Sequence, residues 1–404
     1  MQVRFLEAAD AAALRARHAG LDDAQAARLA AAVDARLLAL AVPPSVAARG
    51  ALQDAGAVVA DDGATTLIAA TRAQLLAARD HAPAEIDALL AALDRAHATP
   101  PSLRLRERTL DLRDEARVMG IVNVTPDSFY ERVDGAPAAL AKARAIAADG
   151  GALVDVGGQS YAHWNRRVSA EEERERVVPA VQAIVADGLE LAISIDTFKA
   201  GVADAALAAG AHLINDCSGL FDPDLAPVVA QHGAALVVMH LRGELNLRTP
   251  ERYVYRDALA EIVEFLYERT ERALAAGVAR DAIAIDPGLE FGKEPATDLE
   301  ILERFGELRA LGYPILFASS RKSFIGRIFG RPAKELLVPS LATAAIGIAA
   351  GARVLRVHDV AETVQLARMM AAVAPERRAA LAIAAAMPGT PAAGNPPGTP
   401  AVSP

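Results

Sequence analysis

The 404-residue chain has little cysteine, few aromatic residues and no long uninterrupted apolar stretch. Its one cysteine, Cys217, excludes an intramolecular disulfide framework and a cysteine-rich zinc or cluster site. No apolar run reaches the ~18 residues of a membrane-spanning helix, and the charged start lacks the apolar centre of a signal peptide. Acidic residues outnumber basic ones, and the net charge of −9 disfavours a general nucleic-acid or anionic-membrane surface. These absences predict a soluble, cytoplasmic protein without nucleic-acid or membrane partners.

The composition is that of a globular protein, with 53% hydrophobic and 23% charged residues. The length is well above the ~150 residues of one average domain, so we expect a large domain and a smaller one. We place a small N-terminal α+β domain at 1–104, with a helix over Leu21–Leu40, and a large domain at 105–380. Residues 97–117 are interpreted as a linker, because two prolines precede a charged, non-amphipathic stretch. The Pro/Gly-rich segment 386–404 is expected to be a disordered tail.

The large domain alternates short apolar runs with helical stretches, many of which end in glycine. Continuous apolar runs are typical of strands buried on both faces, and strict strand–helix alternation requires a parallel sheet. The eight runs are 118–124, 152–158, 191–197, 211–217, 235–241, 282–288, 314–320 and 353–359. Eight such units predict an α/β fold of the (β/α)8 TIM-barrel type. An enlarged flavodoxin-like open sheet is the alternative.

Polar residues gather at the carboxyl ends of these runs, which share one mouth in a barrel. Asp196, Asn215 and Asp286 follow or interrupt apolar segments, where an unpaired polar group costs about 1–3 kcal/mol. Any one of them alone would be interpreted as a helix cap or turn residue. Their recurrence at most strand ends instead predicts a site for a polar heterocycle with amide-like donors and acceptors.

Basic residues follow the last two runs, where barrels usually bind phosphate. Ser320–Ser323 comes after the seventh run, and Arg356 and His358 end the eighth. We expect Lys322 on an exposed loop end to supply a point charge, Arg356 a planar fork, and His358 a donor whose charge switches near neutral pH. The alternative for Arg321 and Arg356 is a surface ion pair.

Two motifs, NVTPDSF at 123–129 and SRKSFIG at 320–326, are specific enough to indicate a family. Further matching motifs follow in order: DVGGQS (155–160), SIDT (194–197), LINDCSG (213–219), VVMH (237–240), DPGLEFGK (286–293) and RVHDV (356–360). Over residues 105 to about 375 the chain resembles dihydropteroate synthase. The resemblance implies a transferase of folate biosynthesis that joins 6-hydroxymethyl-7,8-dihydropterin diphosphate to 4-aminobenzoate, uses Mg2+ and releases diphosphate. It also implies a homodimer.

The resemblance assigns roles to individual positions of this chain. It places Asp196, Asn215, Asp286 and Lys322 at the pterin, Asn123 near the metal and diphosphate, and Arg356 and His358 at the diphosphate. It places Met239 as a wall of the pterin pocket, and Phe291 and Ser323 near the aminobenzoate. Lys322, Arg356 and His358 are the expected catalytic residues, acting by charge and position, and no covalent nucleophile is expected.

Several positions depart from the family pattern. Tyr161 and Ala162 stand where the family usually has threonine and arginine, Glu290 where glycine is common, and Asp298 where asparagine is common. These changes fall mainly on the second-substrate side. Two alternatives therefore stay open: a pterin-binding methyltransferase relative that serves a corrinoid partner, and a paralogue with an altered or lost second substrate. His240 is interpreted equally well as a packed structural residue or a catalytic one.

Overall fold

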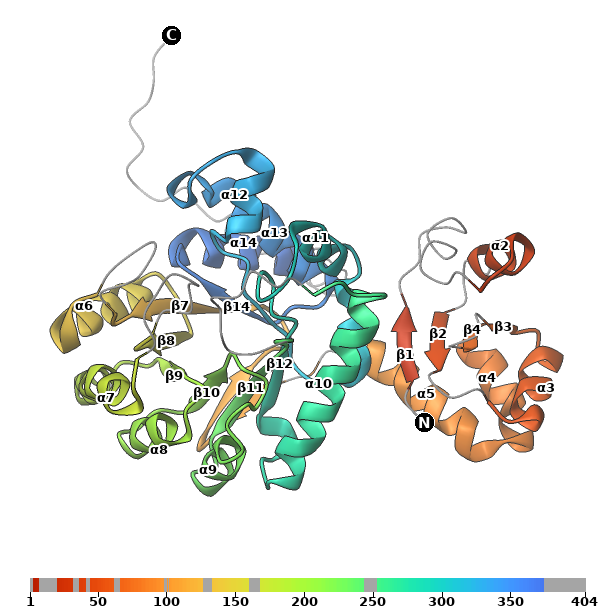
Figure 1. The fold of residues 1–404 in the computed structure, drawn as a ribbon, viewed down its shortest axis with the longest axis horizontal. Coiled ribbons are helices and arrows are strands. Elements are labelled where there is room, and N and C mark those ends of the chain that lie inside the picture. Colours follow the sequence, from red (N-terminus) through yellow and green to blue (C-terminus); the bar gives the residue numbers. More distant parts are fainter. Residues whose placement is uncertain are drawn as a thin grey trace, which may run out of the picture.

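A computed structural model describes most of the chain, and Figure 1 shows its ribbon. The described residues are 3–6, 20–31, 36–40, 44–61, 66–97, 100, 102–125, 133–159, 168–242 and 253–373. The predicted disordered tail at 386–404 lies outside these residues, and so do Tyr161 and Ala162.

The large domain is a barrel of eight parallel strands. They are β7 (Arg117–Asn123), β8 (Leu153–Gly157), β9 (Ala192–Asp196), β10 (Leu213–Asp216), β11 (Ala235–Met239), β12 (Ile283–Asp286), β13 (Leu316–Phe317) and β14 (Val354–Val357). The hydrogen-bonded order is β12-β11-β10-β9-β8-β7-β14-β13. A parallel bridge between Ile285 and Ile315 joins the two outer strands. The TIM-barrel prediction is therefore confirmed, and the open-sheet alternative is wrong.

Helices surround the strands, as expected when the strand bonds must be shielded from water on both faces (Figure 1). They are α6 (Gly135–Ala148), α7 (Ala170–Asp187), α8 (Ala200–Ala208), α9 (Leu225–Gln231), α10 (Ala258–Ala275), α11 (Pro295–Glu303), α12 (Ser323–Phe329), α13 (Leu337–Ala350) and α14 (Val360–Val373). Three 3-10 turns interrupt them: η2 (Arg280–Ala282), η3 (Phe305–Leu311) and η4 (Ala333–Glu335). Within the described part of the chain, no helix combines the length and apolarity that crossing a membrane requires.

A β-hairpin closes the amino-terminal end of the barrel. It consists of β5 (Ser102–Leu105) and β6 (Arg108–Asp111), paired antiparallel. Leu103, Leu105, Leu110 and Leu112 are buried in one cluster with residues of the barrel strands. The linker interpretation of this segment was wrong, because its leucines alternate with polar residues and so line one face of a strand pair.

The N-terminal part folds as an antiparallel sheet with helices. Its strands, in the order β1-β2-β4-β3, are β1 (Val3–Leu6), β2 (Arg36–Leu40), β3 (Val58–Asp61) and β4 (Thr66–Ala70). The helical segments are α2 (Asp23–Ala31), α3 (Val46–Asp54), α4 (Arg72–Ala78), η1 (Arg79–His81) and α5 (Pro83–His97). The helix expected over Leu21–Leu40 was too long, since α2 ends at Ala31 and a strand begins at Arg36.

The N-terminal part packs against η3 of the barrel. Ala310 belongs to the same buried cluster as residues of α3, α4 and α5. Arg95 Nε, on α5, donates to the carbonyl of Ala310 at 2.9 Å. The sequence boundary at 104/105 falls within β5, so the chain enters the barrel through the hairpin and not through a free linker.

Candidate active site

The strand register brings the predicted polar residues to one rim of the barrel. Asp196 pairs in register with Asn215 on β10, and Asp286 with Met239 on β11. Gly157 is the register partner of both Asn123 and Asp196. These side chains therefore lie at the carboxyl ends of six neighbouring strands, as the barrel prediction requires. Their roles as substrate contacts stay predictions.

Asp155 connects several of these residues, and the sequence analysis missed it. Its buried carboxylate accepts from Asn215 Nδ2 at 3.1 Å, from Arg356 Nε at 2.6 Å and from the Ser194 hydroxyl. Arg356 Nη2 also donates to Asp196 Oδ2 at 2.7 Å. Arg356 is thus held by two carboxylates inside the barrel mouth, and the surface ion-pair alternative is wrong for it. The sequence signal that could have identified Asp155 is its place as a charged residue in the middle of an apolar run.

Two buried carboxylates at this rim hold protons more strongly than free aspartate. Burial raises the pKa of Asp196 to about 7, although the nearby Arg356 opposes the shift. Burial also raises the pKa of Asp286, against the pull of Lys322. Asp286 Oδ1 accepts from the Gly288 amide at 2.7 Å, whereas Asp196 Oδ1 is buried with no hydrogen-bond partner among the described residues. An unpaired buried acceptor of this kind is available to a donor from a ligand.

Lys322 is half-buried against the loop after β12, and does not lie on the exposed loop end that we expected. Its Nζ donates to the carbonyl of Leu289 at 2.6 Å and lies 4.9 Å from the centroid of the Phe291 ring. Burial lowers the pKa of Lys322, and Asp286 acts in the opposite direction. The next residue, Ser323, donates its amide to Glu290 Oε1 at 3.0 Å. Lys322, Phe291 and Ser323 therefore lie close together.

The predicted phosphate corner contains a neutral histidine. His358 Nδ1 lies 3.1 Å from the Ser320 hydroxyl, which also accepts the His358 amide at 3.2 Å. Burial lowers the pKa of His358 to about 3, so the ring is neutral at pH 7 and does not switch as expected. Arg321 is also buried, and donates to both carboxylate oxygens of Asp359 at 2.8 and 2.6 Å. Arg321 thus fixes the loop, and Lys322 and Arg356 carry the charge at the rim.

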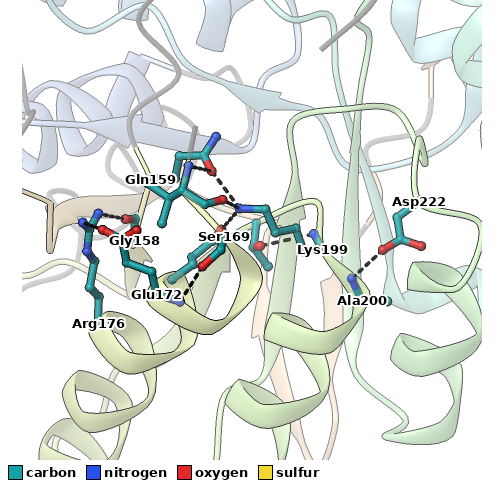
Figure 2. A network of polar contacts seen from close by, with 11 residues as sticks. Gly158, Gln159, Ser169, Glu172, Arg176, Lys199, Ala200 and Asp222 are labelled. Carbon is teal, nitrogen blue, oxygen red and sulfur yellow. Dashed lines mark hydrogen bonds and ion pairs between the residues drawn. The ribbon is translucent and has the colours of Figure 1, made fainter. Parts of the chain in front are cut away.

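Lys199 forms hydrogen bonds with the segments before and after residues 160–167 (Figure 2). Its Nζ donates to Gln159 Oε1 at 2.7 Å and to the carbonyl of Val168 at 2.8 Å. It also pairs with Glu173, which is fully buried at the start of α7. Sequence reasoning did not identify this lysine; the signal was its place three residues after Asp196.

An apolar cluster lies beside the polar rim. Cys217, Met239 and Leu241 are buried together, and Phe291 packs against them. Met239 thus has the surroundings expected of a pocket wall, and Cys217 those of a small buried apolar residue. The next residue, His240, contacts Phe265 edge-to-face with centroids 4.8 Å apart, and burial lowers its pKa well below the ordinary value. These contacts favour the structural interpretation of His240.

The side-chain oxygens near Gly157 are suitable ligands for a magnesium ion whose other ligands are water and substrate. A Cβ at Gly157 would lie 3.4 Å from Asn123 Oδ1 and 3.8 Å from Asp196 Oδ2, so the absence of a side chain keeps this space open. Amide and carboxylate oxygens suit Mg2+, which usually keeps waters and substrate phosphates as its other ligands. Within the described ranges, no three or more His, Cys, Asp or Glu side chains form a group that could hold a metal ion.

Comparison with known proteins identifies the family of this chain. The family profile described as pterin binding enzyme matches residues 119–358. Dihydropteroate synthase of Bacillus subtilis is 39% identical over 280 residues, which are 69% of this chain and 93% of that protein. A Mycobacterium tuberculosis protein named inactive dihydropteroate synthase 2 is 40% identical over 267 residues, 64% of this chain and 83% of that one.

A solved structure has the same barrel. Dihydropteroate synthase of Thermus thermophilus, in complex with 4-aminobenzoate, superimposes with a TM-score of 0.61 at 37% identity, covering 68% of this chain and 100% of that one. With the profile match over residues 119–358, this chain belongs to the dihydropteroate synthase family of pterin-binding enzymes.

Proposed function

We propose that this chain condenses 6-hydroxymethyl-7,8-dihydropterin diphosphate with 4-aminobenzoate, forming 7,8-dihydropteroate and diphosphate. The observation that carries the proposal is the buried rim of Asp196, Asn215 and Asp286, with Asp196 Oδ1 left without a partner among the described residues. The ring N–H and amino groups of a pterin can donate hydrogen bonds to such carboxylate and amide oxygens. The relative from Thermus thermophilus was also solved in complex with 6HMPPP, which supports the same ligand class.

The reaction breaks the C–O bond between the pterin methylene and the diphosphate, and the electron pair leaves with the diphosphate oxygen. Arg356 and His358 are proposed to bind that oxygen-rich leaving group, the first by charge and the second as a neutral donor. The arylamine then attacks the electron-poor methylene carbon and loses a proton. Because this amine is neutral at pH 7, the chain needs no strong general base. The buried Cys217 is not required as a nucleophile.

Magnesium is proposed to accompany the diphosphate near Asn123, in the space that Gly157 leaves open. When bound, the ion would neutralise part of the charge of the leaving diphosphate. Asn123 would orient it through its amide oxygen, and Asp155 would keep Arg356 and Asn215 in place beside it.

The second-substrate side is proposed to lie between Phe291, Lys322 and Ser323. The Phe291 ring offers an apolar face and Lys322 a positive charge 4.9 Å from its centroid. An aromatic amine with a carboxylate has a matching face and charge. Tyr161 and Ala162, the main departures from the family pattern, lie outside the described residues.

Release of diphosphate, measured with and without 4-aminobenzoate, tests the proposal. A synthase releases diphosphate only when the amine is present. Tight binding of the pterin diphosphate without turnover would favour the inactive paralogue, an alternative supported by the 40% identity to the inactive mycobacterial protein. Methyl transfer from a reduced folate to cobalamin would favour the methyltransferase alternative.

Two broader expectations also belong to the proposal. We propose a homodimer formed through α13 and α14, because Val338, Ile346 and Met369 are exposed by 73%, 49% and 62% on these two packed helices. Exposed apolar side chains on neighbouring elements are typical of protein interfaces. A cytoplasmic location, expected from the sequence, stays a prediction.

A further inference from the structure

Glu290 has a backbone conformation that is unusual for a side-chain-bearing residue. Its φ angle is +72°, in the left-handed region that favours glycine. Its amide donates to Asp298 Oδ1 at 2.7 Å, and the preceding carbonyl, of Leu289, accepts from Lys322. These two contacts hold the peptide group before Glu290, and the Phe291 amide after it donates to the Gly288 carbonyl at 3.2 Å. The backbone is therefore fixed on both sides of Glu290, and its side chain has a defined direction.

The Glu290 carboxylate faces the start of α12. Its Oε1 accepts the Ser323 amide at 3.0 Å and also the Ser323 hydroxyl. Ser323 is exposed, and Glu290 is half-buried. Both Ser323 donors thus point at a carboxylate of the chain itself, beside the Phe291 ring and Lys322.

Lys322 lies among charged groups of both signs. Asp286, Glu290 and Asp298 each act on Lys322 as opposite charges, whereas Lys293 is buried in the same loop and donates to the carbonyl of Gly288 at 2.6 Å. With the Arg356 guanidinium, which also acts on Lys322, three carboxylates lie among three cationic groups in this part of the site. A second substrate that carries its own carboxylate would compete with Glu290 for the Ser323 donors and for Lys322.

We propose that Glu290 determines which arylamines this site accepts, by weakening the binding of those that carry a carboxylate relative to neutral ones of the same shape. This inference rests on the proposed function, because it places the arylamine beside Ser323 and Phe291. The wild-type chain should then bind 4-aminobenzoate, its proposed substrate, less tightly than a chain without the Glu290 charge would.

The test compares 4-aminobenzoate with 4-aminobenzamide, which keeps the ring and amine but has no charge. Glu290→Gln retains an oxygen acceptor for Ser323 and removes only the charge. We expect it to raise kcat/KM for the acid about tenfold relative to the amide, mainly through KM, which is the size expected for one nearby charge. Glu290→Gly should act in the same direction, since glycine suits the positive φ and the loop should keep its fold.

Glu268→Gln is the matched control, because Glu268 is 62% exposed on α10 and loses the same charge away from this loop. It should leave the acid-to-amide ratio unchanged. The inference would be overturned if the ratio of kcat/KM for the acid to that for the amide stays within twofold of the wild-type value in both Glu290 variants. Equal changes of kcat/KM for the acid and the amide would overturn it as well. If no variant turns over, the ratio of dissociation constants for the two amines, measured by calorimetry with inorganic diphosphate and Mg2+ present, decides in the same way. Binding of the pterin diphosphate, measured separately, tests the proposed function alone.

Discussion

At the scale of single residues, the mouth of the barrel is organised around a carboxylate that is not expected to touch substrate. Asp155 holds Asn215 and Arg356, two residues that the sequence analysis placed at the barrel mouth. The sequence shows an acid within an apolar strand, and this predicts a buried partner. It cannot show which side chain supplies that partner, because Arg356 lies 201 positions away in the chain.

Asp155→Asn should impair substrate binding more than the chemical step. Asparagine keeps the shape but removes the charge that orients Arg356, and breaking a buried ion pair in this way typically costs about 3–5 kcal/mol. We expect KM for the pterin diphosphate to rise at least tenfold, with a lower melting temperature. Steady-state kinetics well below the melting temperature of the variant would measure the effect.

Ser194→Ala is the control for Asp155→Asn, because it removes only the hydroxyl that donates to the other Asp155 oxygen. It should lower stability modestly and leave KM nearly unchanged. A normal KM in Asp155→Asn, or an equal rise in Ser194→Ala, would show that Asp155 supports the fold and does not position Arg356.

His212 provides a prediction about acid stability that is independent of the site. Burial lowers the pKa of His212 to about 4, and its Nδ1 accepts the Ile193 amide at 3.1 Å. Below pH 6.5, the usual pKa of histidine, His212 becomes protonated in the unfolded chain but stays neutral in the folded chain. The free energy of unfolding therefore falls as the pH drops from 6.5 towards 4. His212→Asn keeps an acceptor and cannot titrate.

Urea unfolding at pH 7.0 and pH 4.5 measures this contribution of His212. The loss of unfolding free energy between the two pH values should be smaller in His212→Asn by about 2 kcal/mol. The carboxylates with raised pKa, such as Asp196, oppose the trend but are common to both proteins. Equal losses in the variant and the wild type would contradict the predicted contribution.

At the scale of secondary-structure elements, the eight barrel strands could be predicted because each is a continuous apolar run between helices. Their lengths could not be predicted: the run at 314–320 contains only a two-residue strand, Leu316–Phe317, whose pairing with β14 ends at Phe317. The hairpin of β5 and β6 was missed because β5 has only two buried leucines and β6 only one, among charged neighbours. The packing that orders such short strands comes from the barrel end, which lies far away in sequence.

Lys199 contacts Gln159, Val168 and Glu173, so its removal should affect both stability and the two segments that it joins. In Lys199→Met, the fully buried Glu173 loses its cation, so we expect a clearly lower melting temperature. The segments ending at Gln159 and beginning at Val168 also lose their common donor. We expect KM for 4-aminobenzoate to rise severalfold, measured by diphosphate release.

The double variant Lys199→Met with Glu173→Gln separates the two effects. Neutral glutamine removes the unpaired buried charge, so much of the lost stability should return. The rise in KM should persist, because the donor to Gln159 and Val168 is still absent. If KM recovers together with stability, Lys199 has no separate positioning role.

At the scale of the whole molecule, two surfaces of the barrel have different relations to the rest of the chain. The η3 side is covered by the N-terminal part, through the Ala310 cluster and the Arg95 hydrogen bond. Composition predicts that a second folded part exists, but its docking site depends on a short 3-10 turn that has no distinctive sequence pattern. The α13–α14 surface, in contrast, is not covered by the described residues of the N-terminal part, and its apolar side chains are exposed in the single chain.

A charge on the α13–α14 surface should therefore change the oligomeric state without changing the fold of the chain. Ile346 is 49% exposed on α13, and Ile346→Glu would bury a carboxylate in the proposed dimer interface. The wild type should have twice the 42.1 kDa chain mass in light scattering, and the variant one chain mass at the same concentration. Val46→Glu is the matched control, since Val46 is 90% exposed on α3 and should leave the mass unchanged. A monomeric wild type, or a dimer that persists in both variants, would exclude this surface as the interface.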